Sequence, residues 1–142
     1  MPKSNVERFS DRVENYVKYR PGYPPEALSF LKNELGLESS SAVADVGSGT
    51  GISSRLFLEN GNPVFGVEPN EGMRRAAEEF LKKFPNFKSL DGTAEATGLP
   101  DKSVRFVVAA QAFHWFDARR TRAEFKRILQ PGGFVVLIWN ER

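Results

Sequence analysis

The chain has 142 residues, of which 40% are hydrophobic and 27% are charged, and this is the composition of one ordinary globular domain. Its formal net charge of +2 is too small to indicate a surface for nucleic acid or for an anionic membrane. The absence of cysteine excludes disulfides and thiolate metal sites, and no stretch approaches the ~18 apolar residues of a membrane span. We therefore expect a cytoplasmic enzyme or binding domain, with no metal and with no nucleic-acid or membrane partner.

The first 36 residues are predicted to form a helical lid segment ahead of the main domain. Between residues 5 and 20, apolar side chains recur at helical spacing, which predicts a short amphipathic helix. These side chains are Phe9, Val13, Tyr16 and Val17. The proline-rich run 20–25 ends this helix and starts a second one, because proline suits a first helical turn. Gly36 is a suitable C-terminal cap for the second helix.

Residues 37–142 are predicted to form a single core in which strands alternate with helices. The apolar runs predicted as strands are 42–45, 63–68, 87–90, 104–110 and 134–139. The helices predicted between them are 52–59, 70–84 and 117–129, and 91–100 is predicted as a loop. This alternation is typical of an α/β fold with a doubly wound, Rossmann-like parallel sheet, right-handed crossovers and the strand order 3-2-1-4-5.

The stretch after the first strand is rich in glycine and reads Asp45-Val46-Gly47-Ser48-Gly49-Thr50-Gly51. Glycine lets the backbone turn with positive φ, and it removes the Cβ atoms that would keep a ligand away from the main chain. The helix that follows points its free N–H groups and the positive end of its dipole at whatever occupies the loop. A dinucleotide fingerprint needs the spacing G-x-G-x-x-G, but here Ile52 stands where the third glycine belongs. The alternative is a glycine turn that is purely structural.

A second acidic residue ends the next predicted strand. Glu68 follows Gly47 by 21 residues, close to the ~20 expected for a carboxylate that accepts both hydroxyls of a ribose. The alternative is a solvated strand end. In the predicted winding, the glycine loop, Glu68, the loop 91–99 and the loop 111–116 all lie at the carboxyl ends of the strands, beside the first strand. The sequence therefore predicts one crevice that four loops build.

Five segments in the same order resemble the class I S-adenosylmethionine (SAM)-dependent methyltransferases that act on small molecules, of the methyltransferase type 11-like kind. The segments are 45–51, 67–73, 93–95, 111–116 and 129–133, and they span almost the whole chain. The resemblance implies SAM as the cofactor and a small molecule as the methyl acceptor. It implies cofactor contacts from Asp45, Gly47, Ser48, Gly49, Gly51, Glu68, Pro69, Met73, Thr93, Ala94, Glu95 and Gln111.

The resemblance also assigns parts of the cofactor to these residues. The glycines and Ser48 would approach the methionine part, while Asp45 would order the loop or bind the amino group. Glu68 would hold the ribose, and Met73 would pack near the adenosine unless it is a plain core residue. Residues 93–95 would meet the adenine edge. At position 93 the family often has an aspartate, whereas the threonine here would bond the exocyclic amine more weakly.

Five other side chains are candidates for contacts with the acceptor. His114 is the one histidine of the sequence, and a titrating imidazole in an aromatic loop can act as general base for an acceptor hydroxyl or amine. The alternative is a histidine that only shapes the pocket, next to Trp115. Tyr16, Tyr19 and Arg20 lie in a segment that resembles the lid of the family. Arg20 would pair with a carboxylate of SAM or of the acceptor, or it is a surface arginine at a helix end.

We therefore expect the core of a SAM-dependent methyltransferase that acts on a small molecule. Two alternatives stay open: a non-catalytic SAM-binding module, and a nicotinamide-dependent oxidoreductase, which the position of Ile52 argues against. The chain ends after the fifth strand, where members of the family usually continue, so we expect a part of a longer protein. The fifth strand would then be an open apolar edge, through which two copies could form a dimer.

Overall fold

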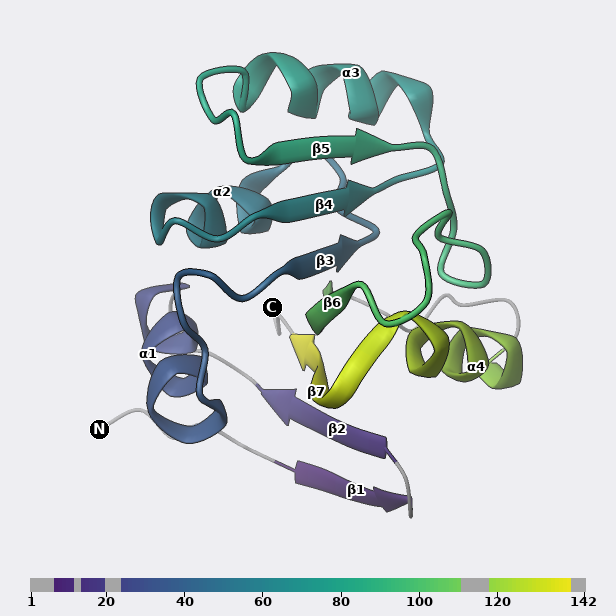
Figure 1. Ribbon diagram of the computed structural model, residues 1–142. Coiled ribbons are helices and arrows are strands. Elements are labelled where there is room, and N and C mark those ends of the chain that lie inside the picture. Colours follow the sequence, from purple (N-terminus) through teal and green to yellow (C-terminus); the bar gives the residue numbers. More distant parts are fainter. Residues whose placement is uncertain (1–6, 12–13, 20–23, 111–117, 139–142) are drawn as a thin grey trace.

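The computed structural model describes residues 7–11, 14–19, 24–110 and 118–138, and within them the chain forms a seven-stranded sheet (Figure 1). The strands are β1 (Glu7–Asp11), β2 (Glu14–Tyr19), β3 (Val43–Val46), β4 (Val64–Val67), β5 (Phe87–Leu90), β6 (Val104–Ala110) and β7 (Leu129–Ile138). The helices are α1 (Pro24–Leu35), α2 (Ile52–Glu59), α3 (Glu71–Phe80) and α4 (Ala118–Ile128). Within the described ranges, no helix has the length and apolar character that crossing a bilayer requires.

Five parallel strands in the order β5-β4-β3-β6-β7 form the main body of the sheet. In chain order this is 3-2-1-4-5, so the predicted Rossmann-like fold class is confirmed. The winding reverses at β3, which pairs with β4 on one side and with β6 on the other. Open α/β sheets bind ligands beyond the carboxyl ends of the strands at such a reversal. The fold therefore places its binding edge at the end of β3.

The predicted helix over residues 5–20 is wrong, because β1 and β2 occupy this segment. β1 pairs antiparallel with β2, with Phe9 opposite Tyr16. β2 in turn pairs in parallel with β7, with Tyr19 beside Ile138. The residues 14–19 are rich in aromatic and β-branched types, which favour strands, and β7 offers them unpaired N–H and C=O groups. A partner distant in the sequence thus overrides the local helical spacing; the helix predicted after the prolines is confirmed as α1.

The pairing of β2 with β7 also corrects the expectation of an open edge at the fifth predicted strand. β7 has β6 on one side and β2 on the other, so β1 becomes the outermost strand (Figure 1). The predicted dimer relied on that open edge. The dimer stays a prediction, but the edge of β7 is not available as its interface.

The predicted turn at 131–133 lies inside β7, where it breaks the strand's register. Leu129 pairs with Val104 and Phe134 pairs with Phe106, so several residues of β7 lie opposite Arg105 alone. The chain turns there through Gly132, whose φ is +81°. The glycines at 132 and 133 therefore mark a break in the register of β7 with β6. The strand begins before these glycines, whereas the sequence predicted that it begins after them.

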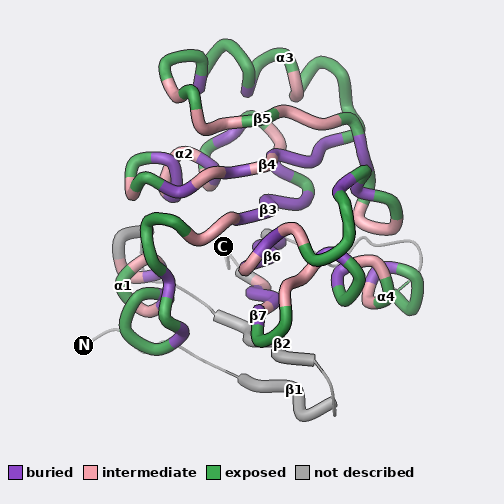
Figure 2. Tube along the Cα trace, viewed as in Figure 1, coloured by how far each residue is buried: buried purple, intermediate pink, exposed green. Residues whose placement is uncertain are grey.

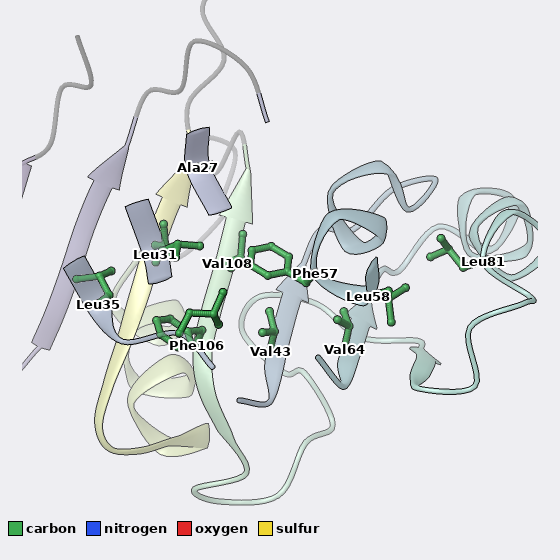
Figure 3. Packing of buried hydrophobic residues seen from close by; sticks show 12 residues of the cluster. Ala27, Leu31, Leu35, Val43, Phe57, Leu58, Val64, Leu81, Phe106 and Val108 are labelled. Atoms are coloured by element: carbon green, nitrogen blue, oxygen red, sulfur yellow. The ribbon is translucent and has the colours of Figure 1, made fainter. Parts of the chain in front are cut away.

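The hydrophobic core has two halves, one on each face of the sheet. On one face, α1 and α2 pack over Val43, Val64, Phe106 and Val108 (Figure 3). On the other, Phe125 and Ile128 of α4 join a cluster with Ala44, Val67, Val107 and Val135. Neighbouring residues of a strand face opposite sides, which explains why β3 is buried along its whole length and why residues 104–109 of β6 are buried except for Arg105 (Figure 2). Helices on both faces thus leave the strand ends as the accessible part of the sheet.

Replacing Phe57 by alanine should lower the free energy of unfolding by about 3–5 kcal/mol, because a buried ring leaves a cavity when it is removed. Phe57 is 0% exposed, on the α2 face of the core. The same change at Phe80, whose ring is 43% exposed, is the control and should cost less than about 1 kcal/mol. Urea denaturation of both variants measures the difference, and equal losses would contradict this division between core and surface.

Candidate functional site

Three of the four predicted loops meet at the carboxyl ends of β3, β4 and β5. The main-chain N–H groups of Gly47 and Ser48 donate to the carbonyl of Val67, at 2.7 and 3.2 Å. In the same way, the N–H of Glu68 donates to the carbonyl of Leu90 at 3.0 Å. Each loop is therefore held against the end of the neighbouring strand. The fourth predicted loop, 111–116, lies outside the described residues.

The glycines of the loop have two different roles. A Cβ atom added at Gly47 or at Gly49 would meet nothing within 4 Å, so at both positions the main chain is open to a ligand. At Gly51, where φ is +96°, an added Cβ would lie 2.8 Å from Leu81 Cδ1 and 3.3 Å from Ala77 Cβ. Gly51 lets the start of α2 pack against α3. A contact of Gly51 with a ligand stays a prediction.

Glu68 ties the glycine loop to the start of α3. It follows β4 directly and is 8% exposed, so the alternative of a solvated strand end is wrong. Its Oε1 accepts the N–H of Gly49 at 2.8 Å, and its Oε2 accepts the N–H of Asn70 at 3.1 Å. A carboxylate oxygen has two acceptor positions. Each oxygen of Glu68 therefore keeps one for a hydroxyl of a ligand.

Asp45 is fully enclosed at the end of β3, with 1% of its surface exposed. Its Oδ2 accepts hydrogen bonds from Ser54 Oγ at 2.7 Å and from Ser53 Oγ at 3.1 Å, which fastens β3 to the first turn of α2. Its Oδ1 has no hydrogen-bond partner among the described residues. Burial raises the pKa of Asp45 to about 6; hydrogen bonds from Ser54 and Ser53 oppose this rise, and the charge of Glu68 adds to it. The two roles predicted for Asp45, ordering the loop and binding an amino group, stay predictions.

Ser53 and Ser54 are site residues that the sequence reasoning missed. They follow Asp45 by eight and nine residues, in the first turn of the helix after the glycine loop. The signal available in the sequence was a pair of adjacent serines at the start of the predicted helix, shortly after the acidic residue Asp45. Serines at such positions usually form hydrogen bonds with the backbone, but here both hydroxyls donate to the carboxylate of Asp45.

Met73 lies in the first turn of α3, next to the Glu68 loop. Asn70 caps this helix as predicted, because its Oδ1 accepts the N–H of Met73 at 2.9 Å. The side chain of Met73 is 44% exposed, so the alternative of a plain core methionine is wrong. Pro69, between Glu68 and the cap, is exposed as well. An accessible thioether thus stands beside the carboxylate predicted to hold the ribose.

Arg74 is a third residue that the sequence did not reveal. Its Nη1 donates to the carbonyls of Glu68 and Pro69, both at 3.1 Å, and lies 3.2 Å from Asp91 Oδ1. It therefore links the segment after β4 to the segment after β5. Nothing local distinguishes this arginine from the other charged residues of α3, because its partners come from the sheet edge.

Residues 93–95 lie on a tight turn after β5. The N–H of Thr93 donates to the carbonyl of Ala96 at 3.0 Å, and the N–H of Ala96 donates to the carbonyl and to Oγ1 of Thr93, at 3.2 and 3.1 Å. Thr93 is exposed, whereas Ala94 and Glu95 are half-buried. The Thr93 hydroxyl keeps one acceptor position and its proton. The hydroxyl is therefore free for a contact with the edge of a base, which stays a prediction.

The predicted acceptor residues are located only in part. Arg20, Gln111, His114 and Trp115 lie outside the described residues. Tyr16 and Tyr19 belong to β2, where they pair in register with Val135 and Ile138. Since β2 runs parallel to β7, Tyr19 stands at the same edge of the sheet as the glycine loop. Among the residues that the structure describes, no cluster of acidic or histidine side chains is suited to a metal ion.

Comparison with known proteins adds to this geometry. The family model described as "Methyltransferase domain" matches residues 44–137. A methyltransferase of Mycobacterium tuberculosis is 39% identical over 134 residues, which cover 94% of this chain and 52% of that protein. One of Schizosaccharomyces pombe is 33% identical over 135 residues, with 94% and 53% covered. The chain thus spans about half the length of these curated relatives.

A solved structure resembles the fold as well. The SAM-dependent methyltransferase from Aquifex aeolicus is 27% identical to this chain and superposes with a TM-score of 0.67. The match covers 76% of this chain and 58% of that one. The similarity therefore extends beyond the glycine loop to most of the sheet.

The buried carboxyl of Asp45 predicts a pH effect on stability. Its pKa of about 6 lies above the 3.8 of an ordinary aspartate, so the folded state binds the proton more tightly than the unfolded state. The contribution of this proton to the free energy of unfolding is complete below pH 3.8 and is lost as the pH rises through about 6. The shift corresponds to about 3 kcal/mol. In Asp45→Asn this dependence is absent. From about pH 4 to about pH 7.5, the unfolding free energy of the variant should therefore gain about 2–3 kcal/mol relative to the parent.

Urea denaturation at each pH measures this gain. Asp91→Asn, the same change at an exposed side chain, is the control for the substitution itself. A difference between Asp45→Asn and the parent that is the same at both pH values would contradict the burial of a titrating carboxyl.

Alanine at Gly51 and alanine at Gly49 should have different effects on stability. Gly51→Ala combines a left-handed backbone with a collision against Leu81, and should cost about 2–4 kcal/mol. Gly49→Ala meets only the backbone cost at φ +59°, about 1 kcal/mol. Thermal and urea unfolding of the two variants test this difference. A larger loss at Gly49 would show that the packing role is assigned to the wrong glycine.

Proposed function

The chain belongs to the methyltransferase domain family, and from this premise we propose that it is the cofactor-binding core of a SAM-dependent methyltransferase with a small-molecule acceptor. The observation that carries the proposal is the buried carboxylate of Glu68. It accepts the N–H of Gly49 and the N–H of Asn70, and it keeps an acceptor position on each oxygen. Two oxygens fixed in this way fit the two hydroxyls of a ribose.

The rest of the strand edge fits the other parts of the cofactor. The open main chain at Gly47 and Gly49 would receive the methionine part, next to Ser48. The free Oδ1 of Asp45 would accept a hydrogen bond from the amino group, which satisfies an otherwise unpaired buried oxygen. Met73 would cover a face of the adenine ring. Residues 93–95 would meet the edge of the same ring.

The reaction itself makes modest demands on the protein. When bound, the cofactor supplies a methyl group that a positively charged sulfur has already activated. The protein therefore contributes positioning and exclusion of water rather than a nucleophile of its own. On this proposal His114 would take the proton from the acceptor hydroxyl or amine when the methyl group leaves the sulfur for that atom. Tyr16, Tyr19, Arg20 and Trp115 would surround the acceptor or bind a carboxylate.

The alternative of a nicotinamide-dependent oxidoreductase has less support. A dinucleotide fingerprint uses its third glycine for close packing of the helix on the strand. In this chain Gly51 has the packing role, against α3, and Ile52 is 73% exposed. A non-catalytic SAM-binding module would use the same cofactor residues. Methyl transfer by the longer protein separates that alternative from an enzyme.

Calorimetric titration of the chain with S-adenosylhomocysteine, and with NAD in parallel, tests the proposal. We expect micromolar binding of the first and none of the second. Glu68→Ala should weaken binding about 10–100-fold, because it removes charged acceptors from the ribose. Glu78→Ala, the same change at an exposed position of α3, is the control and should bind like the parent.

Each of the other outcomes contradicts part of the proposal. Binding of NAD alone, or of neither ligand, would contradict a SAM-binding core. Full affinity in Glu68→Ala would contradict the ribose contact and leave the cofactor assignment standing.

A further inference from the structure

One carboxylate of α4 fastens the loop that follows β5. Glu124 Oε2 accepts the N–H of Thr97 at 2.9 Å and the hydroxyl of Thr97 at 2.7 Å. Thr97 is 0% exposed, and its Oγ1 in turn accepts the N–H of Leu99 at 3.2 Å. Glu124 thus replaces water for two polar groups that the loop could not otherwise bury.

Arg127 holds the same carboxylate from its other side. Its Nε donates to Glu124 Oε1 at 3.0 Å and its Nη2 to Oε2 at 2.7 Å, which is the two-bond geometry of a strong pair. Arg127 also donates to the carbonyl of Leu99 at 2.7 Å and to Asp101 at 2.6 Å. We call Thr97, Asp101, Glu124 and Arg127 the loop clamp. Burial alone would raise the pKa of Glu124, but hydrogen bonds from Arg127 and Thr97 outweigh it and lower the pKa to about 2, so the clamp is charged at neutral pH.

The loop clamp is connected through the main chain to residues 93–95, which are predicted to contact adenine. Thr97 comes directly after the turn that the Thr93 and Ala96 hydrogen bonds close. A Cβ added at Gly92 would lie 2.6 Å from the carbonyl oxygen of Thr97, so the two ends of this turn are in contact. The position of residues 93–95 therefore depends on where Thr97 is held, and Glu124 holds it.

A purely stabilising ion pair explains these contacts less well. Exposed pairs contribute little, and Glu79 of α3 makes such a pair with Lys82, just beyond the helix, with side chains that are 73% and 70% exposed. Glu124 is only 10% exposed on its side chain and directs one oxygen at both polar groups of a buried threonine. Contacts of this kind fix a loop in place.

We propose that Glu124 is a positioning residue of the cofactor site: through Thr97 it sets the position of the turn 93–96 and thereby the selection of the cofactor's base. This inference rests on the proposed function, which puts residues 93–95 at the adenine edge. It predicts that loss of the clamp changes the preference among bases more than it changes the fold.

The test compares S-adenosylhomocysteine with S-inosylhomocysteine, which has an oxygen in place of the exocyclic amine. The parent chain should prefer the adenine compound by about ten-fold or more, since a site that hydrogen-bonds a group rejects a ligand without it. In Glu124→Gln, which keeps the shape but removes the charge, this preference should fall to about two-fold or less. Calorimetry gives both affinities, and thermal unfolding shows that the variant is folded.

Two further variants keep the test decisive if Glu124→Gln does not fold. Thr97→Val removes the hydroxyl at similar volume and should lose the preference, whereas Thr97→Ser keeps the hydroxyl and should retain it. Glu79→Gln is the matched control, because it makes the same change in an ion pair of the same sequence spacing, away from the loop. It should behave like the parent.

The outcomes separate this inference from the function on which it rests. If the parent does not bind S-adenosylhomocysteine, the proposed function fails and the inference fails with it. If the parent binds but shows no preference, or if Glu124→Gln weakens both ligands by the same factor or leaves both unchanged, then only the positioning role is overturned.

Discussion

A carboxylate that is withdrawn from water needs hydrogen-bond donors, and Glu68 obtains them from two main-chain N–H groups, of Gly49 and Asn70. These donors belong to the glycine loop after β3 and to the cap of α3. The glycine loop in turn lies against the end of β4 through Gly47 and Ser48. Much of the strand edge is thus arranged around one negative charge. Burial raises the pKa of the neighbouring Asp45, and the charge of Glu68 adds to this rise. A site so organised has its binding geometry before any ligand arrives.

Asp45 and Glu124 show how hydrogen-bond donors decide the protonation state of a carboxyl group that is shielded from water. Both are shielded from water, yet the pKa of Asp45 is raised to about 6 and that of Glu124 is lowered to about 2. Asp45 receives hydrogen bonds from two serine hydroxyls, which do not compensate for burial. Glu124 receives them from the guanidinium of Arg127 and from the hydroxyl and N–H of Thr97, and these hydrogen bonds together with the charge of Arg127 outweigh the burial. The carboxyl of Asp45 is therefore sensitive to pH near neutrality, whereas the carboxyl of Glu124 stays charged there and keeps its hydrogen bonds.

The parts of the fold that were predictable are those with a local cause. The apolar runs of β3, β4 and β6, the cap at Asn70 and the glycine turn before α2 all follow from the residues at those positions. The helix predicted over 5–20 failed because its segment pairs with β7, which the local spacing of apolar residues does not show. The clamp between Thr97 and Glu124 likewise joins residues far apart in the sequence. In the site, Glu68 was predictable from its distance to Gly47, whereas Arg74 was not, because its partners are carbonyls at the ends of strands.

The pairing of β2 with β7 has a consequence for how the chain comes together. β2 is synthesised well before its partner β7, because the other strands of the described sheet except β1 lie between them in the sequence. The central pair of β3 and β4 is separated by one short helix and can assemble early. Chains fold as they emerge from the ribosome, so the N-terminal strands wait for the sheet that they complete. The two strands at the start of the sequence are then the last to join the structure, and until they do so β7 is the strand most exposed to wrong partners.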